Sequence, residues 1–304
     1  MGKIPIAASS ASGPADVSSP SADMFSSFIL DDAAQQAGRQ PWVAMECNQL
    51  SSARSIGVMD VIDFGTHRIV RETQTASVHK VGITPDNFCT LSICTPGCSR
   101  IGAHEDSRID TVFFLPSRTE FDLLIAEGAR TTYVSFPEDD FLRAVEALRP
   151  RASKNAAAGM QALNMADKTL FEAAVTQWFQ TVASAGARGS AADCVNLGTT
   201  FRETIYRILT ATDPQEGNDV SSGERARGLK IGRQARERIE ELLQSDELPS
   251  VSRLCEELGV SERGLQYAFR EYVGVPPLAY IRLCRLNRAR TLLRESTPAD
   301  MTVT

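Results

Sequence analysis

The chain lacks any apolar run long enough to cross a membrane, although 42% of its 304 residues are hydrophobic. A membrane-spanning helix needs about 20 consecutive apolar residues, so the sequence predicts no membrane partner. The first 24 residues are small and polar, contain proline, and lack the apolar centre of a signal peptide. We therefore predict a disordered leader at 1–24 and a cytoplasmic location.

Histidine is scarce, and nucleotide-binding motifs are absent. The three histidines form no clustered His-x-His motif of the kind that brings several metal ligands together in a β-barrel. No P-loop and no GxGxxG sequence occurs. We predict no catalytic residue, no metal and no cofactor, and keep a β-barrel metal enzyme as an alternative. Its ligands would come from His67, His79 and His104.

The seven cysteines are an odd number, and free thiols in a reducing cytosol are their simplest explanation. Cys89, Cys94, Cys98 and His104 lie within sixteen positions, but their spacing is not a usual zinc pattern. Because Cys89 and Cys94 are five positions apart, they would face opposite sides of one strand. A zinc site, and a thiol redox sensor at Cys94 and Cys98, stay open as alternatives.

Short β-type runs fill the region 25–150. They are bounded by Gly, Pro, Asn or Asp, and several alternate between apolar and polar residues, as half-buried strands do. Many short strands at regular spacing indicate a sandwich or a small barrel. A helix is expected from Pro137. The expected strands are 58–64, 68–71, 77–83, 88–94, 111–115, 121–125 and 131–136.

Three aromatic residues of this region are candidates for lining a small-molecule pocket. The alternation of the strands places Phe113, Phe121 and Tyr133 among the apolar positions. Packing in the core is the alternative role for each of them, and the sequence does not separate the two.

Helical patterns follow at 151–212. Apolar residues recur at helical spacing in 169–183 and in 192–211, so we expect two helices, each with one apolar face. These faces either form a homodimer by interdigitation or pack against the chain's own β-region. Residues 213–228 have the composition of a linker, and 229–304 are expected to form an all-α domain.

The most informative stretch runs from Ser250 to Leu293 and predicts a helix-turn-helix. Gly259 suits the turn because glycine tolerates positive φ, and Ser261 is a good N-cap for the second helix. The first helix has an apolar face, and the second is expected to bury Leu265, Ala268 and Phe269.

The opposite face of the second helix indicates contact with double-stranded DNA. In a helix-turn-helix this helix enters the major groove, where Arg pairs with guanine and Gln with adenine. We therefore expect Arg263, Gln266 and Tyr267 to face bases, and Arg270 to contact phosphate. From Arg263 to Arg294 there are seven arginines and one acid, whereas the whole chain carries −6, and such a local basic patch favours nucleic-acid binding.

This stretch resembles the first helix-turn-helix and the linking helix of AraC/XylS transcription regulators. The matching features are Leu254, Leu258-Gly259-Val260-Ser261, Leu265, Phe269, Gly274, Pro276 and Arg285-Leu286…Ala289-Arg290. The resemblance implies an α+β protein, with a cupin-like β-rich sensor domain before the helical DNA-binding domain. It implies a regulator, activator or repressor, that responds to a small-molecule effector. It also implies that Arg263, Gln266 and Tyr267 face the bases. We further expect Ser261, Arg282 and Arg285 to contact the DNA backbone.

Members of this family carry two such units, and this sequence holds one. Asp300-Met301-Thr302-Val303-Thr304 resembles the entry into a second unit. We therefore expect a truncated chain that binds its operator poorly, since lost phosphate contacts cost orders of magnitude in affinity. A gel-shift assay with 1–304 tests this. The alternative to a working regulator is a sensor or dimerisation fragment that inhibits full-length partners.

Overall fold

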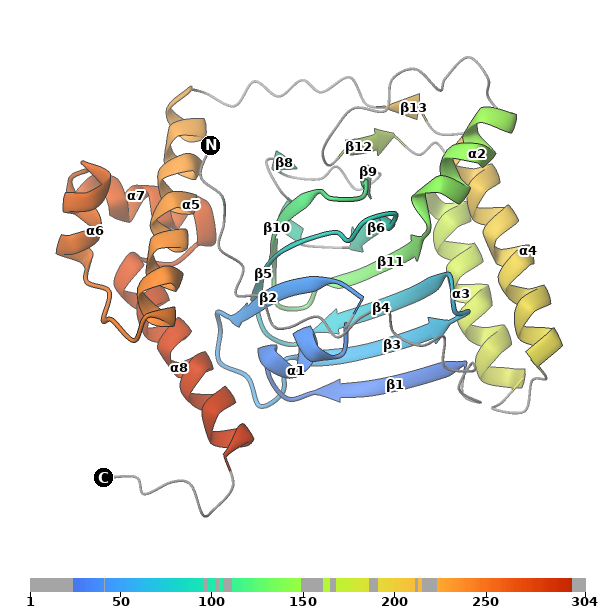
Figure 1. Ribbon diagram of the computed structural model, residues 1–304, viewed down its shortest axis with the longest axis horizontal. Coiled ribbons are helices and arrows are strands. Elements are labelled where there is room, and N and C mark those ends of the chain that lie inside the picture. The colour runs from blue at the N-terminus through green and yellow to red at the C-terminus, as the bar shows by residue number, and fades with distance from the viewer. Residues whose placement is uncertain are drawn as a thin grey trace.

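The computed structural model (Figure 1) describes residues 24–40, 42–95, 98–101, 104–105, 111–148, 161–164, 168–185, 191–210, 213–214 and 223–296. The expected leader therefore lies outside the described residues except for Met24, as do Asp300 to Thr304. Within the described ranges, no helix combines the length and the apolar character that crossing a membrane requires.

Two antiparallel sheets form the β-rich part. The eight-stranded sheet, sheet A, runs in the order β1-β3-β4-β11-β6-β9-β12-β13, and the five-stranded sheet, sheet B, in the order β2-β5-β10-β7-β8. The strands of sheet A are β1 (Phe25–Leu30), β3 (Gly57–Asp63), β4 (Arg68–Gln74), β11 (Arg130–Phe136), β6 (Cys89–Thr95), β9 (Thr111–Leu115), β12 (Gln161–Asn164) and β13 (Asp213–Pro214). Those of sheet B are β2 (Ala44–Gln49), β5 (Val78–Ile83), β10 (Glu120–Ile125), β7 (Cys98–Ile101) and β8 (His104–Glu105).

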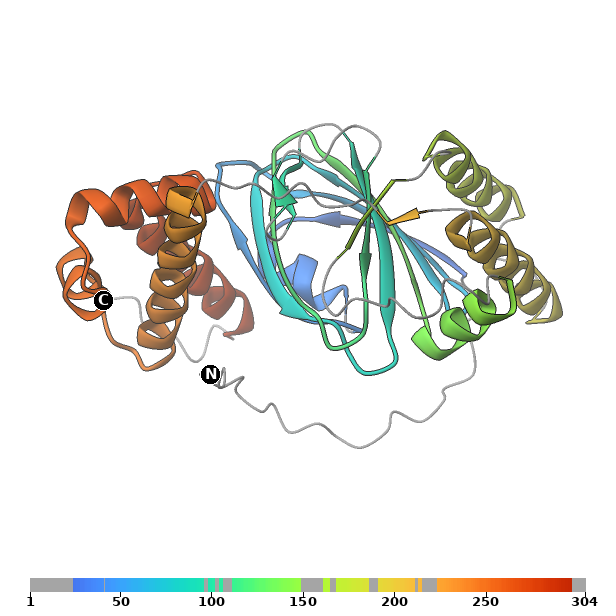
Figure 2. The same cartoon turned by 90° about the horizontal axis from the view of Figure 1, so that it is seen from above.

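An apolar core lies between the two sheets, because alternate residues of each strand face inward. Met59, Val70 and Phe113 of sheet A meet Val78 and Phe121 of sheet B in this inner core. The short helix α1 (Ala33–Gly38) packs beside β2. Figure 2 shows the two sheets curving around this interior.

Helices α2 (Glu138–Leu148), α3 (Lys168–Ala185) and α4 (Ala191–Thr210) cover the outer face of sheet A. Phe171 and Val175 of α3 and Phe201 of α4 pack with Ile69 and Leu91 of the sheet. The structure thus shows the intramolecular alternative for these helices. Their apolar stripes cover the chain's own β-sheet.

The C-terminal part is helical and lies against sheet B on the opposite side (Figure 1). It comprises α5 (Gly223–Gln244), α6 (Val251–Leu258), α7 (Glu262–Val273) and α8 (Pro277–Glu295). Its core also includes Leu50 and packs against Leu124, so two residues of the β-rich part belong to it.

The α+β fold class expected from the sequence is confirmed, since antiparallel sheets precede an all-α region. The boundaries differ in two places. Helix α5 begins at Gly223, inside the range expected as a linker, and β12 and β13 lie within ranges expected to be helical or linker. Both strands are short additions to the edge of sheet A: β12 pairs with β9, which is remote in sequence, and β13 pairs with β12.

Candidate nucleic-acid interface

The turn between α6 and α7 has the local geometry that its residues favour. Ser250 caps α6 by accepting a hydrogen bond from the backbone N–H of Arg253 at 3.2 Å. Gly259 ends that helix at φ 63°, where a residue with a side chain would be strained. Ser261 caps α7 by accepting from the N–H of Gly264 at 3.1 Å. These contacts confirm the predicted helix-turn-helix and fix the angle at which α7 leaves the turn.

One face of α7 packs against α5. The residues predicted to be buried, Leu265, Ala268 and Phe269, are each at most 1% exposed. The two helices approach closely at Gly232 of α5, where an added Cβ would lie 2.4 Å from Cβ of Tyr272. Glycine at this position therefore allows the close packing that holds α7 in place.

The other face of α7 is exposed and carries the residues expected to read DNA. Arg263, Gln266, Tyr267 and Arg270 are all exposed, on a helix whose opposite side is buried. The Gln266 amide donates to Glu262 Oε1 at 3.2 Å, so this bond must break before the amide can pair with a base. Neither sheet covers this face.

Helix α8 divides its arginines between two surfaces. Arg282 and Arg285 are exposed and form no ion pair within the described part of the chain. Arg288 pairs with Asp246 at 2.8 Å, and Arg290 pairs with Asp32 at 3.3 Å. The positive patch expected from the sequence is thus partly neutralised by acids.

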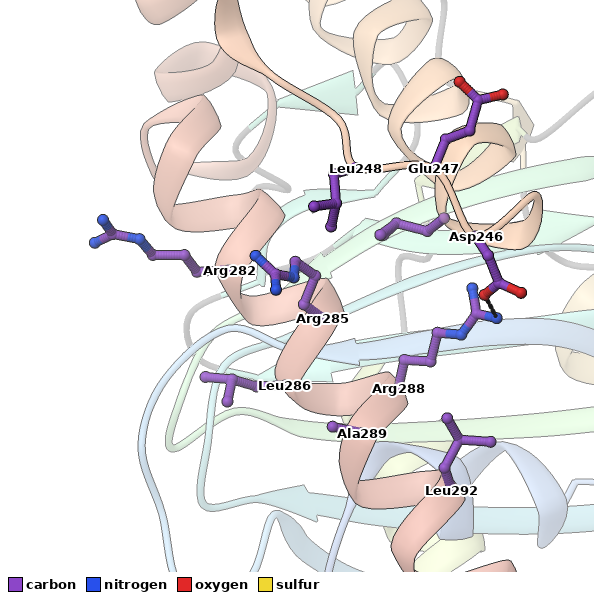
Figure 3. Close-up of a pocket in the computed structure, with 10 residues that line it drawn as sticks. Asp246, Glu247, Leu248, Arg282, Arg285, Leu286, Arg288, Ala289 and Leu292 are labelled. Carbon is purple, nitrogen blue, oxygen red and sulfur yellow. Dashed lines mark hydrogen bonds and ion pairs between the residues drawn. The ribbon is translucent and has the colours of Figure 1, made fainter. Parts of the chain in front are cut away.

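A groove of about 560 Å³ separates the C-terminal end of α5 from α8 (Figure 3). Leu243, Leu248, Leu286 and Leu292 contribute apolar surface. Arg282 and Arg285 lie on the α8 side of it, and Arg288 reaches across to Asp246.

An ion pair between Arg238 of α5 and Glu257 of α6 links these two helices. Glu257 of α6 accepts from Arg238 at 2.5 Å and from Arg253 at 2.8 Å. These two guanidinium groups lower the pKa of Glu257 to about 2. The carboxylate therefore stays charged at any physiological pH.

A largely buried polar cluster joins the β-rich part to the helical domain, and we call this cluster the latch. It consists of His79 on β5, Asp122 on β10, Tyr272 on α7 and Tyr280 on α8. His79 Nε2 lies 2.9 Å from Asp122 Oδ1, and the Tyr272 hydroxyl donates to Asp122 Oδ2 at 2.5 Å. The Tyr280 hydroxyl lies 3.4 Å from His79 Nδ1. Two residues of sheet B thus hold both helices that carry the expected DNA contacts.

Charged groups flank the latch. Arg236 lies 2.6 Å from Glu240 and 3.9 Å from Glu46 of β2. Burial raises the pKa of Glu240 to about 8, against the opposing effect of Arg236. At the far end of α8, Arg294 reaches Asp31 at 3.3 Å and also pairs with Asp32, which caps α1.

The three aromatic residues proposed for the pocket come together between the sheets. Phe113 and Phe121 are buried in the inner core, and Tyr133 packs against it. The Tyr133 hydroxyl donates to Glu72 Oε1 at 3.3 Å, and burial raises its pKa well above the ordinary value.

Glu72 is the centre of a buried polar cluster that was not predicted from the sequence. It is 1% exposed, and it accepts hydrogen bonds from Lys80, Gln36 and Gln40. Buried charges occur in proteins when they are paired. A glutamate at an inward-facing position of β4, and a lysine at one of β5, were the available signals.

The cysteines bear on the free-thiol, redox and metal-site expectations. Cys94 is disulfide-bonded, so the expectation of free thiols is wrong for this residue. Cys89 packs in the core between sheet A and the helices that cover it, whereas Cys94 packs against the inner core between the sheets. This confirms that they face opposite sides of β6. Among the described residues, no three His, Cys, Asp or Glu side chains gather as a metal site. The side chains of Cys98 and His104 lie outside the described residues.

The comparisons with known proteins agree with this geometry. A helix-turn-helix family model matches residues 254–304, which include α6, α7 and α8 apart from the first turn of α6. No curated protein matches the chain.

Solved structures resemble the chain more loosely. The AraC-like transcriptional activator CuxR shares 16% identity over 88% of this chain and 87% of that one, with a TM-score of 0.37. ToxT from Vibrio cholerae shares 13% identity over 76% of this chain and 84% of that one, with a TM-score of 0.28. The assignment rests on the family match and on the turn geometry. Residues 254–304 are an AraC-type helix-turn-helix domain, and the chain that carries it is a DNA-binding transcription regulator.

Proposed function

We propose that this regulator recognises a specific DNA sequence through the exposed face of α7 and responds to a small molecule held between its two sheets. The observation that carries the first part is the exposed position of Arg263, Gln266 and Tyr267 on a helix whose other face is buried. Such a helix lies in the major groove, with its N-terminal residues against base edges. Because DNA is the partner, the proposed location is the cytoplasm.

The proposed backbone contacts surround this face. Ser261 lies at the N-terminus of α7, where unpaired N–H groups and the helix dipole favour a phosphate. Arg270 is one turn beyond the base-facing residues, and Arg282 and Arg285 have no acidic partner among the described residues. Free arginines bind phosphate without first breaking an ion pair.

The proposed effector site is the interior of the β-rich part, lined by Phe113, Phe121 and Tyr133. Glu72 accepts a hydrogen bond from Tyr133 and is paired with Lys80. An interior that combines aromatic surface with a few hydrogen-bonding groups suits a small polar molecule. Such a ligand would replace some of the bonds that Glu72 now accepts from Gln40 and Tyr133.

The route from this interior to the DNA-binding domain follows the alternation of β5 and β10. On β5, Lys80 faces Glu72 in the interior, whereas the adjacent His79 faces Tyr272 and Tyr280. On β10, Phe121 packs in the inner core, whereas Asp122 accepts from Tyr272. Lys80 directly follows His79 in the chain, and Phe121 directly precedes Asp122. A ligand that moves Lys80 or Phe121 therefore also moves a residue of the latch. The ligand can change DNA affinity only by the difference between its own affinities for the DNA-binding and the non-binding conformation.

The DNA-binding part is tested by selecting duplexes from a random-sequence library with the full chain. We expect a defined sequence to be enriched. Arg263→Ala should then weaken binding to that duplex by about 1–3 kcal/mol and relax one base position. Arg118→Ala is a matched control, since Arg118 is an exposed arginine of the β-rich part and lies outside the helix-turn-helix. Equal weakening on all duplexes would show that Arg263 contacts only phosphate.

The effector part is tested by a thermal-shift screen of small metabolites with the full chain, because a ligand of the native state raises its apparent stability. A hit should lose its effect in Tyr133→Phe, which removes the hydroxyl that Glu72 accepts from. An unchanged shift in that variant would place the ligand elsewhere. A hit that alters affinity for the selected duplex would establish the response itself.

A further inference from the structure

Gly264 occupies a position in α7 where glycine is unfavourable. It is the third residue of the helix, after Glu262 and Arg263, and its φ is not in the left-handed region. Glycine within a helix is destabilising relative to alanine, because the unfolded chain is freer and the helix gains no side-chain contact. A structural or functional reason for the glycine is therefore needed.

Packing within the chain does not supply that reason. A Cβ built on Gly264 would have one neighbour within 4 Å, the Ser261 Oγ at 3.3 Å. Helices capped by serine commonly carry Glu or Gln at this third position, in the capping box. A side chain here needs the Ser261 hydroxyl to move by a few tenths of an ångström, and serine-capped helices with Glu or Gln at this position accommodate that.

Gly232 shows what a packing role looks like, whereas Gly228 is a position where packing does not require glycine. At Gly232, a Cβ would lie 2.4 Å from the Tyr272 Cβ and 2.9 Å from the Ala268 carbonyl oxygen, so α5 and α7 need a glycine there. At Gly228, a Cβ would lie 3.6 Å from the ring of Tyr267, in ordinary contact. Gly264 has no such contact with α5 or α6, and its missing side chain leaves space on the outside of the domain.

That space borders the face expected to meet DNA. Gly264 directly follows Arg263, and Tyr267 lies one turn further along the same helix. The Tyr267 ring rests beside Gly228 of α5 and is still 49% exposed. The glycine therefore leaves bare helix backbone next to a half-exposed aromatic ring and an exposed arginine.

We propose that Gly264 is a specificity-determining residue, which lets the backbone of α7 come into direct contact with the DNA in the major groove. Glycine is used where a backbone must approach a ligand closely. A side chain at this position separates the helix from the groove and moves Arg263 and Tyr267 away from the base edges. The inference rests on the proposed DNA recognition by α7.

Opposite effects on stability and on binding test the proposal. Gly264→Ala should unfold at the same temperature as the native chain or a few degrees higher, because alanine is the better helix former. Its affinity for the duplex selected by the native chain should fall about tenfold or more, comparable to the loss of a base contact. Gly264→Leu should fold equally well and bind more weakly still. Gly38→Ala is the matched control, since Gly38 is an exposed helical glycine of α1 with nothing within 4 Å of an added Cβ.

The outcomes separate this inference from the proposed function. If the native chain enriches no sequence, DNA recognition by α7 itself fails. If the native chain enriches a sequence and Gly264→Ala and Gly264→Leu bind it with unchanged affinity, the close approach at Gly264 is refuted. Loss of affinity together with an unfolding temperature below that of the native chain would also refute it, since a folding defect would then explain the loss.

Discussion

Replacing Asp122 by alanine should loosen the docking of the DNA-binding domain on sheet B. Asp122 accepts from the buried Tyr272 hydroxyl at 2.5 Å and pairs with the buried His79 at 2.9 Å. The substitution removes both bonds and leaves two polar groups without this partner. A hydrogen bond to a charged group contributes about 1.5–3 kcal/mol. Because Asp122 is partly open to solvent, with 19% of its side chain exposed, we take the lower end for each bond and expect a loss of about 3 kcal/mol.

Two measurements follow this loss. Urea unfolding gives the free energy, and hydrogen exchange locates it, with faster exchange expected in β5, β10 and α7. Asp86→Ala is the control, since Asp86 is 81% exposed and its ion pair with Arg118 spans 3.4 Å. It should change stability by less than about 0.5 kcal/mol. If Asp122→Ala unfolds like the native chain and exchange in those elements is unchanged, the latch does not hold the domains together.

Two further predictions concern other buried positions. Gly232→Ala should destabilise the chain by about 1–3 kcal/mol in urea unfolding, because its Cβ would clash with Tyr272, and an unchanged midpoint would contradict the packing of α5 on α7. Burial lowers the pKa of His67 to about 4, from 6.5. Between pH 4 and 6.5 the unfolded chain therefore binds more protons at this residue than the folded chain does. The free energy of unfolding loses about 3 kcal/mol as the pH falls from 6.5 to about 4. His67→Phe should flatten the dependence of stability on pH across that window.

Local signals account for most of what the sequence could predict. The turn at Gly259, the cap at Ser261 and the buried face of α7 follow from spacing and residue type, and the structure confirms them. Seven strands of the β-rich part were located by alternation and turn residues to within a few positions. These features depend on residues that are close together in the chain.

Contacts between distant residues could not be predicted in the same way. The latch joins His79 to Tyr280, and a second contact joins Asp31 and Asp32 to Arg294. Arg290 and Arg294 were grouped with the DNA-facing arginines by composition, yet they bind acids near α1. Charge counts along a chain do not show which charges the fold neutralises. Which residues meet DNA, and which line a pocket, stay predictions.

The alternation of β5 has a consequence for how this chain tolerates insertions. His79 and Lys80 are adjacent, yet one contacts the DNA-binding domain and the other pairs with Glu72 in the interior. A one-residue slip of a strand moves every side chain to the opposite face. Adding one residue at the start of β5 would therefore move the imidazole of His79 into the position beside Glu72, and deleting one would move the ammonium group of Lys80 into the position beside the two tyrosines. Because both faces of β5 make specific contacts, this strand should tolerate substitutions better than insertions or deletions.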